Sequence, residues 1–68
     1  FMIDVYSNLS DIISQNPSAA DILMSYGIPY YGNVENQLSS LHDIAIRYGV
    51  DPDSIVNQIN DIGMNSLY

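Results

Sequence analysis

The sequence predicts an all-α protein, a compact bundle of about four short helices with a short extended segment at the N-terminus. Two near-identical helix-stop signals, Tyr26-Gly27-Ile28 and Tyr48-Gly49-Val50, each place a glycine where a helix can end in the left-handed conformation. Two helix-start signals, Asn16-Pro17 and Asp51-Pro52, each pair a capping Asx side chain with a proline in the first helical turn. Between these signals apolar residues recur at intervals of three and four, as on one face of a helix.

The chain is expected to begin with an extended segment and a short helix. Ile3-Asp4-Val5 alternates apolar and polar residues, and its two apolar side chains are expected to anchor it along the helices. The first helix is predicted over Leu9–Gln15. Asn8 is its N-cap, and Asp11 takes the position of the acid in a capping box.

The second helix is predicted over residues 17–26, and an irregular stretch follows it. Apolar residues cover a wide arc of this helix, which indicates the central helix of the bundle. Residues 29–39 form the longest irregular stretch, of a length at which loops are often functional. Val34 and Leu38 are expected to pin this stretch to the core, with one helical turn near 35–38.

The third helix is predicted over Leu41–Tyr48, with a capping box made by Ser40 and Asp43. Asp43 and Arg47 stand four residues apart and are expected to form an ion pair on its surface. Its apolar residues recur at intervals of three and four and form one face, which consists of Leu41, Ile44, Ala45 and Tyr48.

The fourth helix is predicted to start at Asp51-Pro52 and to stop near Gly63, with residues 64–68 frayed. Its inward side chains are expected to be Ile55, Val56, Ile59 and Ile62. Residues 8–12 and 40–44 have similar sequences, and each segment is followed by an Asx-Pro helix start. This internal echo, a weak sequence repeat, suggests that two helix-turn-helix halves pack together. Alternatively, the two segments are similar only because both use common capping residues.

Length and composition limit the chain to one domain, residues 1–68. Phe1 precedes Met2 and is expected to be foreign to the natural protein. Cysteine is absent, so there are no disulfides. Small secreted domains usually need disulfides for stability, so the absence of cysteine favours a cytoplasmic location for this protein.

The charge is strongly negative, because eight Asp and Glu residues face one cation, Arg47, for a net charge of −7. A chain of this charge repels phosphate backbones and anionic lipids, so we expect neither nucleic acid nor a membrane as partner. The acidity either keeps a small protein soluble or matches a basic protein partner.

The order of these signals resembles a small bacterial family, the hybrid-cluster-protein-associated redox-disulfide domain of unknown function. The residues that carry the resemblance are 16–20, 26–28, 40–45 and 48–52, and it covers residues 3–60. The chain is also similar to the N-terminal domain of the iron–sulfur-cluster repair di-iron proteins. The resemblance implies a compact bundle of about four helices.

Many members of that family carry Cys-x-x-Cys in the loop after the Gly-Ile stop. Here the corresponding positions are Tyr30 and Asn33, or Tyr31 if the alignment slips by one residue. Because a tyrosine hydroxyl cannot exchange disulfides, the redox or metal role of the cysteine-bearing relatives does not carry over. The chain is expected to be a cysteine-less variant.

No catalytic constellation is present, so the protein is expected not to be an enzyme and to need no cofactor or metal. His42, the only imidazole, is expected to be an exposed residue in the first turn of a helix. The candidate partner-binding residues are Tyr30, Tyr31 and Asn33 in the loop, although one tyrosine ring could instead cover the core.

We therefore expect a helical module that binds a larger bacterial protein. The alternative, taken from the resemblance, is an accessory factor in iron–sulfur, redox or nitrosative-stress metabolism with a metal or haem site. The chain is expected to be a monomer or a weak dimer, and exposure of Met24 or Leu38 would favour self-association.

Overall fold

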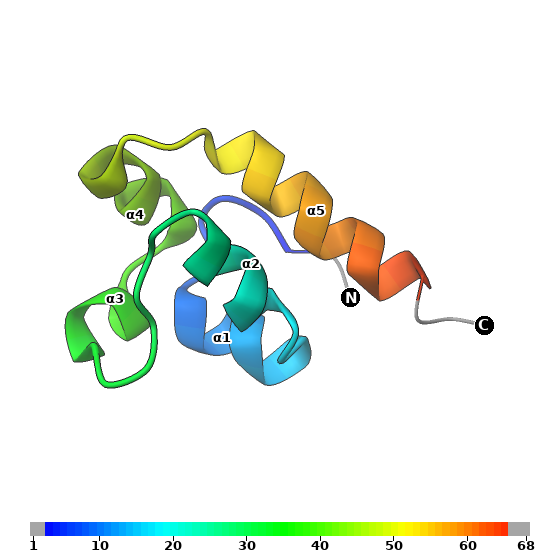
Figure 1. Ribbon diagram of the computed structural model, residues 1–68, viewed down its shortest axis with the longest axis horizontal. Coiled ribbons are helices and arrows are strands. Elements are labelled where there is room, and N and C mark those ends of the chain that lie inside the picture. Colours follow the sequence, from blue (N-terminus) through cyan, green and yellow to red (C-terminus); the bar gives the residue numbers. More distant parts are fainter. Residues whose placement is uncertain (1–2, 66–68) are drawn as a thin grey trace.

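Five helices and no strand make up the described part of the chain, which confirms the all-α prediction (Figure 1). This structure is a computed structural model that describes the backbone of residues 3–65 and the side chains of residues 3–62. Phe1 and the end of the predicted frayed tail, residues 66–68, lie outside the described residues. The helices are α1 (Leu9–Gln15), α2 (Ala19–Ser25), α3 (Val34–Leu38), α4 (Leu41–Tyr48) and α5 (Pro52–Asn65).

One apolar core joins all the helices except α3. Helix α2 packs against both α1 and α5, in agreement with its wide apolar arc, although α1 and α5 also each pack against two helices. Ile3 is buried as the expected anchor, and its backbone N–H donates to Asn60 Oδ1 on α5 at 3.2 Å. The core side chains are Ile3, Leu9, Ile12, Ala19, Leu23, Ile28, Leu41, Ile44, Ile55 and Ile59.

Both predicted glycine stops are confirmed. Gly27 has a φ of 77° and Gly49 a φ of 67°, in the left-handed region. After Gly27, the N–H of Ile28 donates to the carbonyl of Leu23 at 3.0 Å. This bond turns the chain back, so that Ile28 is fully buried under the end of α2.

The predicted caps of α1 and α4 are also confirmed. Asn8 Oδ1 accepts the N–H of Asp11 at 2.9 Å, and Ser40 Oγ accepts the N–H of Asp43 at 3.1 Å. Each side chain satisfies one of the four N–H groups that a helix start leaves without a partner.

These two helix starts lie against each other in an antiparallel bridge between Asn8 and Ser40. The N–H of Leu9 donates to the carbonyl of Ser39 at 3.1 Å, and the N–H of Leu41 donates to the carbonyl of Ser7 at 3.0 Å. The bridge therefore brings together the two segments of the internal echo, residues 8–12 and 40–44.

The start of α2 differs from the prediction. Asn16 is the C-cap of α1, with its N–H donating to the carbonyl of Ile12 at 2.9 Å, and it does not cap α2. The helix begins at Ala19, whose N–H donates to the carbonyl of Asn16, and Ser18 makes no side-chain cap bond. In this tight turn the N–H of Asn16 bonds to α1 and its carbonyl accepts from the first residue of α2. The predicted cap of α2 by the Asn16 side chain is wrong.

Two predicted boundaries also differ. Val5 lies in a turn closed by a bond from the N–H of Ser7 to the carbonyl of Asp4, so the segment is not extended throughout. Gly63 does not stop α5, which continues to Asn65. The second half of α5 extends beyond the other helices in Figure 1.

We predict that Gly27→Ala lowers the free energy of unfolding by about 1 kcal/mol, because an L side chain is strained at positive φ. A Cβ at this position meets no atom within 4 Å, so the change adds no steric clash to the backbone strain. Gly27→Asn is the matched control and should cost less, since Asn tolerates this conformation. Equal stability of the wild type and Gly27→Ala in urea unfolding would contradict the assignment.

Candidate functional site

Helix α3 is inverted: one of its three polar residues is buried, whereas both of its apolar residues are exposed. The side chain of Asn36 is buried, with 1% of the residue exposed. Val34 is 65% exposed and Leu38 is 70% exposed, so the prediction that they pin the loop to the core is wrong. The helical turn expected near residues 35–38 is present as α3.

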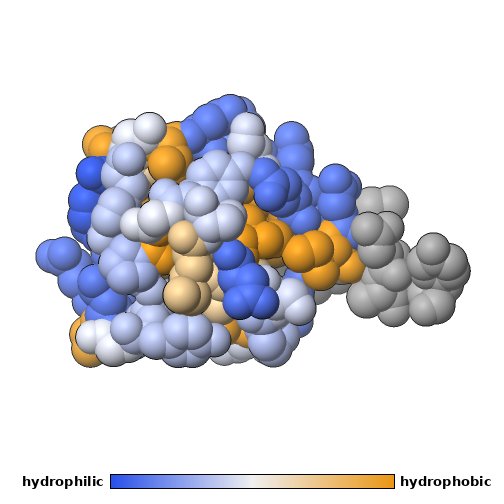
Figure 2. All heavy atoms as spheres, viewed as in Figure 1, coloured by the Kyte–Doolittle hydropathy of each residue, from blue (hydrophilic) through white to orange (hydrophobic). Residues whose placement is uncertain are grey.

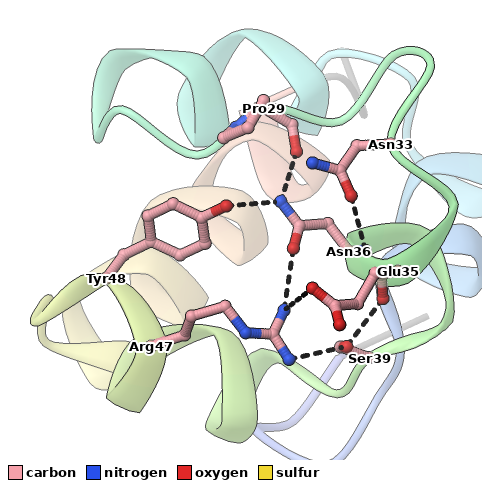
Figure 3. A network of polar contacts seen from close by, with 7 residues as sticks. All are labelled: Pro29, Asn33, Glu35, Asn36, Ser39, Arg47 and Tyr48. Carbon is pink, nitrogen blue, oxygen red and sulfur yellow. Dashed lines mark hydrogen bonds and ion pairs between the residues drawn. The ribbon is translucent and has the colours of Figure 1, made fainter.

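The amide of Asn36 lies between three groups from other parts of the chain (Figure 3). Its Nδ2 donates to the carbonyl of Pro29 and to the hydroxyl of Tyr48, both at 2.8 Å. Its Oδ1 accepts from Arg47 at 2.8 Å. Both N–H groups and the oxygen of the amide therefore have partners, which removes most of the cost of burying it.

Both ends of α3 are fixed as well. Asn33 Oδ1 accepts the N–H of Asn36 at 3.0 Å and caps the helix. At the other end the carbonyl of Ser39 accepts from Leu9, within the bridge between α1 and α4. The Gln37 side chain donates to the carbonyl of Tyr30 at 2.9 Å. These bonds hold a five-residue helix that could not persist in isolation.

Arg47 reaches from α4 to α3 and not along its own helix. Its guanidinium is bound to Asn36 Oδ1 and lies 3.8 Å from the carboxylate of Glu35. The predicted pair with Asp43 is therefore wrong. Asp43 lies instead beside His42, with Nδ1 and Oδ1 3.4 Å apart. A tertiary partner on α3 has replaced the surface pair that spacing alone suggests.

The three residues predicted to bind a partner have different environments. Tyr31 is 70% exposed, whereas Tyr30 is half-buried and packs against the core. The two rings contact edge to face, with centroids 5.3 Å apart and planes at 81°. Asn33 is half-buried, and its side-chain oxygen is occupied by the cap of α3.

We call the exposed side chains of Tyr31, Val34 and Leu38 the α3 face. Val34 and Leu38 are four residues apart on one helix and so lie on the same side of it. Tyr31 precedes them in the turn that leads into α3. Sequence reasoning identified Tyr31 but missed the other two, because a five-residue helix with three polar residues between two apolar ones gives no sign of which polar side chain is buried.

Two further features lie outside the α3 face. His42 stacks on the exposed ring of Tyr6, with centroids 5.6 Å apart, and its backbone N–H donates to the carbonyl of Val5. An open apolar hollow lies at the end of α2 and is lined by Met24, Gly27, Ile28 and Pro29. Figure 2 shows a largely polar face in which smaller apolar areas reach the surface.

Within the described residues, no three His, Asp or Glu side chains gather where they could hold a metal ion. None of the described helices combines the length and apolarity needed to cross a membrane. No protein-family model, curated protein or solved structure matches this chain. The resemblance to the hybrid-cluster-associated family therefore stays a prediction.

We predict that Asn36→Leu destabilises the fold by about 2–3 kcal/mol, because it leaves the partners of a buried amide without hydrogen bonds. Tyr48→Phe removes a single bond and should cost about 1 kcal/mol. Tyr31→Phe removes the hydroxyl of an exposed ring and serves as a control with little effect. Thermal and urea unfolding measure all three variants. An Asn36→Leu protein as stable as the wild type would show that the network does not hold α3.

Proposed function

We propose that this protein is a small non-catalytic module that binds another protein through the α3 face. The observation that supports the proposal is the inversion of α3. A chain this small has little stability in reserve, yet both apolar residues of α3 are exposed on the same side of the helix. Exposed apolar groups that occur together in this way are typical of protein-interaction sites.

The geometry of the site suits binding with little reorganisation. Bonds from Asn33, Asn36 and Gln37 hold α3 before any partner arrives. A surface ordered in advance loses less conformational entropy on binding. Tyr31 adds an aromatic ring with a polar tip, a side chain enriched at interfaces.

The proposal changes the residues that the sequence suggested. Tyr31 stays in the binding surface, Tyr30 supports it from the half-buried side, and Asn33 acts through the cap of α3. The alternative of an iron–sulfur or redox accessory factor depends on the family resemblance alone, and no contact described above supports it. We therefore propose protein binding, in the cytoplasm, as the function.

The test is capture of a partner from cell lysate by the immobilised protein. We expect Val34→Ser combined with Leu38→Ser to lower the captured amount at least about tenfold, because a few central apolar side chains carry most of an interface's energy. Ile46→Ser is the matched control, since Ile46 is also 70% exposed but lies on α4. A partner held equally by both variants would place the binding site elsewhere.

A further inference from the structure

We propose that the partner of the α3 face is a cationic amphipathic segment, a helix with apolar side chains on one side and Lys or Arg beside them. This inference rests on the proposed function and names the chemistry of the partner. Two sets of observations support it: the charge of the whole surface, and the residues that surround Val34 and Leu38.

The surface of the protein is almost purely anionic. Every carboxylate side chain belongs to an exposed residue, whereas the only Lys or Arg, Arg47, is bound to Glu35 and Asn36. A field of one sign steers partners of the opposite sign to the surface. The exposed acidic residues are Asp4, Asp11, Asp21, Glu35, Asp43, Asp51, Asp53 and Asp61.

One of these carboxylates, that of Glu35, flanks the α3 face on the side of Arg47. Glu35 directly follows Val34 and precedes Leu38 by three residues, so its side chain is beside that of Leu38 on the helix. Its side chain is 77% exposed, and its contact with Arg47 is long, at 3.8 Å. A cation on a partner can therefore approach Glu35 from solvent while apolar side chains contact Val34 and Leu38.

A second copy of the chain is a poor occupant of this surface. Met24 and Leu38 are both exposed, which would favour self-association, but two protomers would each bring a net charge of −7 and repel each other. Vesicles of anionic lipid are disfavoured for the same reason. Val34 and Leu38, four residues apart, instead form a short ridge of the kind that packs against the apolar stripe of another helix.

The experiment uses two synthetic amphipathic helices with the same leucine positions, one with lysine and one with glutamate at the polar positions. Each is titrated into the ¹⁵N-labelled protein at physiological ionic strength, and amide shifts are followed by NMR. We expect saturable binding of the leucine–lysine peptide, with the largest shifts over residues 31–38, and no binding of the leucine–glutamate peptide. Shifts from the leucine–lysine peptide that spread evenly over the acidic surface would overturn the inference.

Charge-matched variants separate apolar docking from general attraction. Val34→Ser with Leu38→Ser keeps the net charge and should weaken the leucine–lysine peptide about tenfold or more. Glu35→Gln should weaken it about threefold, the usual size for one exposed ion pair. Asp61→Asn changes the net charge equally on α5 and should leave the affinity within error of the wild type.

The outcomes distinguish this inference from the proposed function. Equal binding of both peptides at residues 31–38 would refute the cationic partner and leave the α3 face as a binding surface. Equal affinity of the leucine–lysine peptide for the wild type and the Val34, Leu38 double variant would refute docking on the α3 face itself. Concentration-dependent dimerisation that the double variant abolishes would identify a second copy as the occupant and also refute the cationic partner.

Discussion

The fold depends on the pairing of two helix starts that are far apart in the sequence. The N-terminal N–H groups of α1 and α4 cannot bond within their own helices, and Leu9 and Leu41 are fully buried. Each of these N–H groups donates to a carbonyl just before the other helix, at Ser39 or Ser7. A buried N–H without a partner costs about 1–3 kcal/mol, so neither helix start can be buried without the other.

This pairing joins the two segments of similar sequence, residues 8–12 and 40–44. The pair α1–α2 and the pair α4–α5 each begin at one of the bridged caps, and α2 packs on α5 across the core. In Figure 1 the loop that carries α3 connects the two pairs and lies at one end of the molecule. The core is therefore built by the two helix pairs, and α3 contributes to the fold mainly through polar contacts.

The parts of the fold that the sequence predicted are those set by neighbouring residues. The caps at Asn8 and Ser40 and the stops at Gly27 and Gly49 each depend on bonds within a few residues, so local patterns reveal them. The orientation of α3 depends on the partners of Asn36, which lie seven residues before it and eleven and twelve residues after it. Val34 and Leu38 are expected to face inward because they are apolar, and residue type carries no information about such partners.

The bonds at the ends of α3 act together with the partners of Asn36 to keep its apolar side chains in solvent. The cap at Asn33 fixes where the helix begins, and the bond between Ser39 and Leu9 fixes where it must end. With only five residues between these points, the helix cannot rotate to bury Val34 and Leu38 unless one end is released. Burying two such side chains would gain about 1.5–3 kcal/mol each, so the constraint at the two ends outweighs a substantial hydrophobic gain. The same bridge that orders the core therefore keeps the candidate binding surface exposed.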